Sequence, residues 1–110
     1  MAAAVRSTTS IALGNRTNTV LTAPSGIAND DILLIVMSIG DNPAQSSTAP
    51  TGFTAATGYP TGAEFTYSSD PNYKVRLHAY YKVASSESGD YTVTHSNADT
   101  EAVMYAISGG

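Results

Sequence analysis

The chain has no cysteine and no tryptophan among its 110 residues, and charged residues make up only 13% of it. Without cysteine, neither disulfides nor thiolate metal ligands are available, so packing alone must stabilise the fold. The formal net charge of −4 disfavours broad binding to nucleic acid or to anionic membranes. The length indicates a single domain over residues 1–110 that is large enough to bury its own core.

Long apolar runs and helical periodicity are also missing. The apolar run at 32–39 is far shorter than the roughly 20 residues that a membrane helix needs. Residues 1–5 are short and mildly apolar, and we interpret them as an N-terminal arm, not as a cleavable signal peptide. No long segment repeats apolar residues with a period of 3.6, which indicates an all-β protein.

Two segments carry the strongest strand signals. Residues 32–39 are almost continuously apolar, which is typical of a central strand covered on both faces. Residues 73–83 alternate between apolar and polar, which predicts a strand with one buried and one wet face. Further strands are expected at 5–13 (a weak edge strand), 18–22, 52–57, 64–67, 90–95 and 101–107, separated by turns and by a long irregular loop at 41–60. This spacing predicts an antiparallel β-sandwich, jelly-roll or immunoglobulin-like, of about six to eight strands.

Polar side chains of segment 73–83 form the first candidate binding surface. They are Lys74, Arg76, His78, Tyr80 and Lys82, and they share one predicted strand face. One interpretation is a basic stripe that docks an acidic partner. The other is an ordinary solvated sheet face, on which the lysine charges prevent an edge strand from pairing with another chain. In both, the opposite face, which includes Leu77, Tyr81 and Val83, is expected to be core.

Two loop aromatics, Phe53 and Tyr59, are further binding candidates because aromatic side chains anchor interfaces or stack on sugars. The two histidines, His78 and His95, show no spacing typical of metal ligands. Neither a Gly-x-Ser-x-Gly nucleophile elbow nor a phosphate-binding loop occurs. We therefore expect no enzymatic activity, no cofactor and no metal site.

Four short motifs carry a family resemblance. They are NDDILLI (29–35), APTGF (49–53), AYYKVA (79–84) and GDYTVT (89–94), and the closing segment AVMYAISG (102–109) follows them. In this order they resemble a β-sandwich domain of bacteriophage virion accessory proteins, which also occurs in bacterial surface proteins. The resemblance covers roughly residues 18–109, and it brings no catalytic residues with it.

The resemblance implies a non-enzymatic structural component of a phage virion: a capsid decoration or cement protein, a head-fibre protein or a tail-associated protein. Such a protein binds other virion proteins of the capsid or tail, is located in the virion and forms a homo-oligomer, with a trimer favoured. Neither nucleic acid nor a membrane is expected as a partner. The alternative is a carbohydrate-binding or adhesin module of a secreted or surface protein, with a host glycan as its partner.

Overall fold

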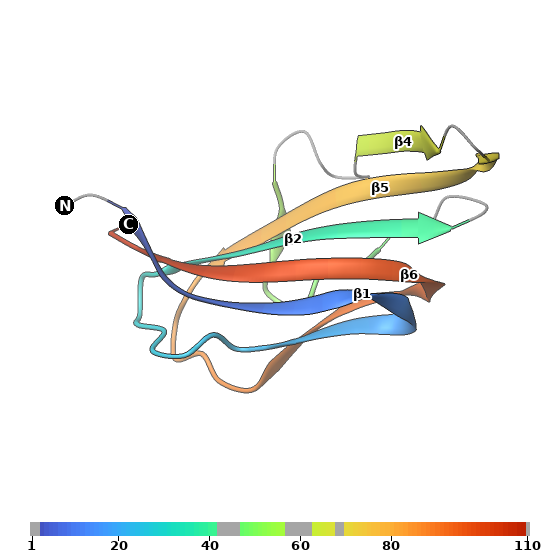
Figure 1. Cartoon of the computed structure of the whole chain (residues 1–110). Coiled ribbons are helices and arrows are strands. Elements are labelled where there is room, and N and C mark those ends of the chain that lie inside the picture. Colours follow the sequence, from blue (N-terminus) through green and yellow to red (C-terminus); the bar gives the residue numbers. More distant parts are fainter. Residues whose placement is uncertain (1–2, 42–46, 57–62, 68–69, 110) are drawn as a thin grey trace.

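The computed structural model describes residues 3–41, 47–56, 63–67 and 70–109 (Figure 1). Its strands are β1 (Ala4–Thr22), β2 (Ile32–Asp41), β3 (Thr54–Ala55), β4 (Ala63–Tyr67), β5 (Asp70–Val83) and β6 (Asp90–Ser108). None of the described residues is helical, which confirms the prediction of an all-β fold. The six strands also agree with the expected number.

All of these strands belong to one antiparallel sheet in the order β1-β6-β2-β5-β3, and β4 also pairs with β5. The apolar strand β2 lies at the centre, between β5 and β6. The Ser- and Thr-rich strand β1 lies at an edge, as its sequence predicted. Within the predicted loop 41–60, the described residues add the short strand β3 and an isolated bridge between Thr48 and Thr94.

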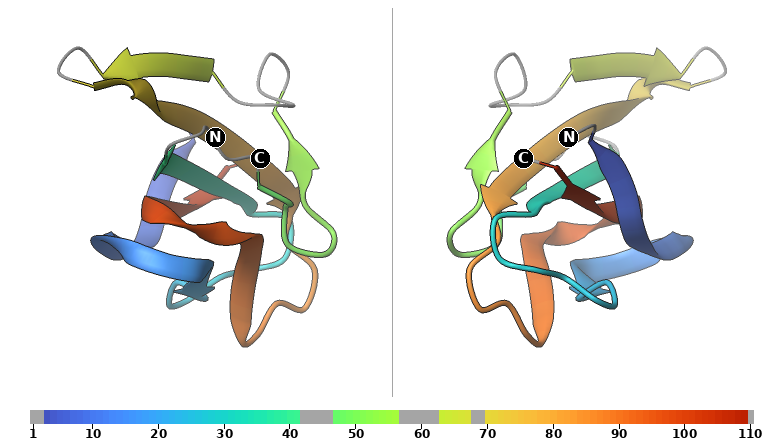
Figure 2. Two further views of the ribbon diagram at one scale, coloured as in Figure 1. Left: turned by 90° about the vertical axis from the view of Figure 1, so that its right-hand side faces the viewer. Right: turned by 90° about the vertical axis from the view of Figure 1, so that its left-hand side faces the viewer.

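The long strands β1 and β6 form a ribbon that bends back over the rest of the sheet. They pair from Ala4 opposite Ser108 to Thr22 opposite Asp90. The pairing register shifts between Ile11 and Gly14 and again between Arg16 and Asn18. These shifts bend the ribbon, because unmatched residues kink and twist a paired strand. The second half of β1 pairs with the first half of β6, and we call this part of the ribbon the bent half. In Figure 2 the bent half lies as a separate layer across the other half. The turns predicted between segments 5–13 and 18–22 and between segments 90–95 and 101–107 are therefore wrong, since the intervening residues belong to continuous strands.

The core lies between these two layers. Leu33, Ile35 and Ile39 of β2 are 0% exposed, and they meet Leu21 and Val93 from the bent half of the ribbon. The intervening side chains of β2, which include Leu34 and Val36, are only half-buried. The prediction that β2 is covered on both faces is therefore wrong for the single chain, because the second layer covers one face only.

A polar network joins the two layers at the bend. Thr19 and Thr100 are both 0% exposed, and their Oγ1 atoms lie 2.7 Å apart. The guanidinium of Arg16 donates to the Thr100 carbonyl oxygen and Oγ1 at 2.5 and 2.8 Å, and to the Ala12 carbonyl at 2.9 Å. A Cβ atom at Gly14 would lie 2.7 Å from this guanidinium, so the glycine leaves room for it. The network satisfies buried polar groups where the bend disturbs the ladder.

The start of β1 is tied to the start of β2. The predicted N-terminal arm, 1–5, is partly strand, since β1 begins at Ala4. Arg6 donates from Nε and Nη2 to the Asp31 carboxylate at 2.8 and 3.1 Å, and the Ala28 N–H donates to the same carboxylate at 2.9 Å. The hydrogen bonds from Arg6 and then from Ala28 lower the pKa of Asp31. These contacts thus fix the start of the edge strand β1 to the start of the central strand β2.

Candidate functional site

Strand β5 presents its two faces opposite to the prediction. His78 and Tyr80 are 1% and 3% exposed, whereas Tyr81 and Val83 are 41% and 53% exposed. The face expected to be wet contributes to the core, and the face expected to be core is open. The reason is the register: His78 pairs with the buried Met37, on the side that the bent ribbon covers.

His78 and Tyr80 form a stacked pair inside the protein. Their ring centroids lie 5.8 Å apart, and the Tyr80 hydroxyl reaches Ser47 Oγ at 2.6 Å and His78 Nδ1 at 3.3 Å. His78 Nε2 is buried and has no hydrogen-bond partner among the described residues. Burial, and then the positive charge of Arg76, lower the pKa of His78, and burial raises the pKa of Tyr80. Two of the predicted docking residues therefore belong to the interior.

The burial of His78 predicts a loss of stability in mild acid. Because its folded-state pKa is lowered, the unfolded chain binds the extra proton first as the pH falls below about 6.5. The stability that neutral His78 contributes is fully present above that pH. It is lost progressively as the pH falls toward the folded-state pKa of His78. The melting temperature should therefore fall between about pH 7 and pH 5, measured by circular dichroism.

Two variants isolate this effect. His78→Leu removes the titrating group and should flatten the pH dependence in that range, whereas His95→Gln keeps His78 and should retain it. A wild-type melting temperature that stays constant over the range would contradict the prediction.

Two predicted binding residues, Lys82 and Phe53, do come together at the end of β5. Lys82 Nζ lies 6.0 Å from the centroid of the Phe53 ring and 3.0 Å from the Glu87 carboxylate. Phe53 meets Tyr91 edge-on at 5.4 Å between centroids, and the Tyr91 hydroxyl donates to Glu87 at 2.7 Å. Sequence reasoning missed Glu87, since the segment 85–89 carries only the signal of a turn. It also missed Tyr91, which lies in the predicted strand 90–95 and has no binding motif around it.

Glu87 is charged although its side chain is only 5% exposed. Burial alone would raise the pKa of Glu87, but hydrogen bonds from the Ser85 N–H, the Tyr91 hydroxyl and Lys82 outweigh it and lower the pKa. Burial and the neighbouring carboxylate raise the pKa of Tyr91, which keeps its hydroxyl protonated as a donor. The result is a structured ion pair beside a pocket of about 590 Å³. The lining of this pocket includes Thr48, Pro50, Thr51, Lys82, Glu87, Tyr91, Thr92 and Thr94.

The other predicted site residues do not complete a stripe. Lys74 and Arg76 are half-buried and lie opposite Thr66 and Glu64 of β4. Tyr59 lies outside the described residues. The predicted set is therefore split between the interior, the β4 side of the sheet and the pocket around Lys82.

The second candidate surface is the side of the sheet away from the core, which we call the open face. Its apolar side chains come from four adjacent strands: Val5 of β1, Val103, Tyr105 and Ile107 of β6, Leu34 and Val36 of β2, and Leu77, Tyr81 and Val83 of β5. Val5, Tyr81 and Val83 are exposed and the others are half-buried. Among the described residues of this face, only Glu101 and Asp99 carry a charge, and the Asp99 carboxylate accepts hydrogen bonds from Asn15 and Tyr73.

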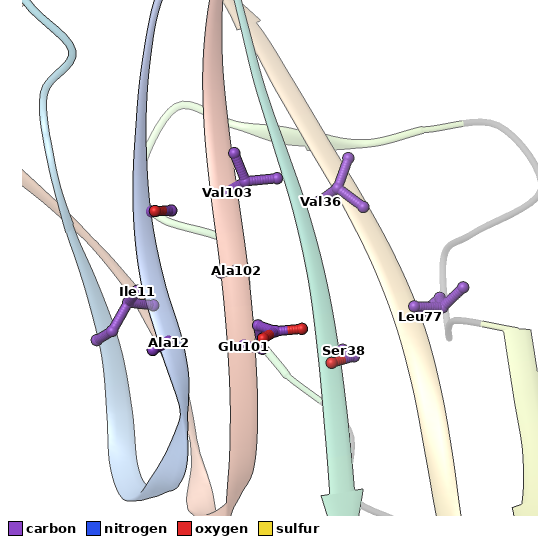
Figure 3. Close-up of a pocket in the computed structure, with 9 residues that line it drawn as sticks. Ile11, Ala12, Val36, Ser38, Leu77, Glu101, Ala102 and Val103 are labelled. Carbon is purple, nitrogen blue, oxygen red and sulfur yellow. The ribbon is translucent and has the colours of Figure 1, made fainter.

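A groove of about 480 Å³ runs over the middle of the open face. Figure 3 shows Val103 of β6 beside Val36 of β2, with Glu101, Ser38 and Leu77 of β5 one step further along the strands. An exposed patch of this kind on a small domain is typical of an interaction site.

Comparison of the chain with protein-family models, with curated proteins and with solved structures found no match. In the part of the chain that the structure describes, no helix is long and apolar enough to cross a membrane. Over the same residues, no three His, Asp or Glu side chains gather into a group that could hold a metal ion. The pocket beside Lys82 and the open face are therefore the two candidate binding surfaces.

Proposed function

We propose that this chain is a non-enzymatic structural domain of a phage virion, which attaches to other virion proteins through the open face. One observation carries the proposal: the open face exposes Tyr81 and Val83 beside half-buried Leu34 and Val36. A domain that worked alone in water would leave this surface uncovered. The resemblance of its segments to virion accessory proteins supports the virion as the setting.

Attachment through this face relies on apolar contact. Fully burying a side chain of the size of valine or leucine contributes about 1.5–3 kcal/mol, and each half-buried one contributes part of that. Several such side chains acting together give useful affinity without any buried ion pair. The neighbouring strands hold them in fixed positions, so little side-chain freedom is lost on binding.

Mass spectrometry of purified phage particles tests the proposal. The particles should come from the host whose DNA encodes the chain, and the chain should be present at a fixed ratio to a capsid or tail protein. Its absence from particles that are otherwise complete would overturn the proposal.

A matched pair of variants then tests the surface. Recombinant chain is added to particles from a genome that lacks its coding sequence. Val83→Glu places a charge on the open face and should abolish attachment. Val20→Glu places the charge on another exposed valine, in β1 and away from the open face (43% exposed against 53% for Val83), and should leave attachment intact.

The polar pocket beside Lys82 favours a second candidate, a carbohydrate-binding module. Hydroxyl groups of Thr48, Thr51 and Thr92 line it next to the Lys82–Glu87 ion pair. A glycan array tests this function: binding that Thr51→Val removes and Thr22→Val leaves unchanged would favour it. An array without any binding would exclude it.

A further inference from the structure

We infer that in the free protein a second copy of this chain covers the open face, packed face to face about a two-fold axis, and that a virion protein takes its place when the chain attaches to a particle. The inference rests on the proposed function in one respect only, that the open face is a binding surface. It goes further by identifying the occupant of that surface. Three properties of the face lead to it: its area, its charge and its position in the sheet.

The area is sufficient for a stable dimer. The face spans the neighbouring strands β1, β6, β2 and β5. Four strands about 4.8 Å apart, with about nine paired residues at about 3.3 Å each, make a face of roughly 19 by 30 Å. Two such faces in contact would bury roughly 1,100 Å², which exceeds the roughly 1,000 Å² expected of a specific interface.

The charge of the face selects an uncharged partner. The open face has no cationic side chain among the described residues, and its two anionic side chains there, Glu101 and Asp99, lie toward one end. A strongly charged partner would lose hydration here without gaining a counter-charge. A second open face presents the same apolar and hydroxyl groups, including Tyr81 and Tyr105, and needs no counter-charge.

The position of Glu101 also selects the orientation of the axis. Glu101 lies opposite Ser38, toward one end of the face, whereas Ile107 and Val83 lie toward the other. An axis parallel to the strands would bring the two Glu101 carboxylates together, and like charges repel. An axis across the strands separates them and still keeps the strands of the two sheets nearly aligned, as packed sheets prefer. This contact is closed and isologous, so it yields a dimer.

Light scattering of the purified chain tests the inference. We expect a mass of twice the 11.4 kDa of one chain at micromolar concentration. Val83→Glu should weaken the dimer at least about tenfold, because it buries an unpaired carboxylate, and Val20→Glu should not change it. Circular dichroism confirms that both variants fold. A monomer, a trimer, or a dimer that Val83→Glu leaves intact would overturn the inference.

Cross-linking gives a second readout that does not depend on destabilising the interface. The chain contains no cysteine, so a single introduced thiol is unique. Val103→Cys lies near the expected axis and should cross-link to a second copy through a short bismaleimide, whereas Val20→Cys should not. Equal cross-linking of both variants would overturn the face-to-face arrangement.

The two proposals fail separately. A chain that is monomeric in solution but attaches to particles in a Val83-dependent way overturns the dimer and leaves the proposed function standing. A chain that forms the Val83-dependent dimer but is absent from particles leaves the dimer standing and overturns the proposed function.

Discussion

Replacing Ile35 with alanine should lower the free energy of unfolding by about 3 kcal/mol. Ile35 is 0% exposed in the central strand β2 and packs in the core between the two layers. Truncation removes its transfer free energy and leaves a cavity that two strand layers cannot close without moving together. Urea denaturation followed by circular dichroism measures the change.

The adjacent residue provides the matched control. Leu34 is half-buried on the open face, so Leu34→Ala should cost about 1 kcal/mol or less in dilute protein. Both variants truncate an isomeric four-carbon side chain on the same strand, so the difference between the two losses reports mainly how deeply each side chain is buried. Equal losses for Ile35→Ala and Leu34→Ala at low concentration would show that both faces of β2 are covered within one chain.

The alternation of β5 was enough to predict a strand but not which of its faces is inside. A period of two separates His78 and Tyr80 from Tyr81 and Val83, and charge then favours the second pair as core. The structure buries the first pair because the bent ribbon covers that side. Tyrosine and histidine tolerate burial where their polar atoms form hydrogen bonds, so their polarity is a weak guide to which face of a strand is buried. The choice depends on pairing between distant strands, which local pattern does not contain.

The bend in the β1–β6 ribbon was predicted in position but not in kind. Gly14 and Asn15 in one strand, and Ser96 and Asn97 in the other, are residues that favour turns. The same residue types occur at bulges, because both features need a departure from regular strand geometry. Only the register of the two strands, with Asn15 opposite Asp99, distinguishes a bent ribbon from two hairpin turns.

The pocket beside Lys82 shows the same limit for the candidate site. Phe53 and Lys82 were each predictable as binding residues, but their contact depends on β3 pairing with β5. Glu87 carries no motif, and its role follows from hydrogen bonds that only the folded turn makes. The residue types were visible in the sequence, whereas the cluster they form was not.

The bend makes its own prediction: Arg16→Ala should lower the free energy of unfolding by about 2–3 kcal/mol. The substitution leaves the buried Thr100 carbonyl without its charged donor and removes the hydrogen bond to the Ala12 carbonyl. The cost should exceed that of an ordinary surface substitution, because Thr100 is 0% exposed and water does not replace the lost donor. Urea denaturation again measures it.

Arg16→Lys separates the shape of the guanidinium from its charge. A lysine ammonium keeps the charge but lacks the planar fork that reaches Thr100 and Ala12 together, so it should recover less than half of the loss. Full recovery would mean that charge alone holds the bend. A loss below about 0.5 kcal/mol in Arg16→Ala would mean that backbone pairing of β1 with β6 holds it without the side chain. The free energy of unfolding should therefore decrease from wild type to Arg16→Lys to Arg16→Ala. The loss matters for the whole domain because the second layer covers the core only while the ribbon stays bent.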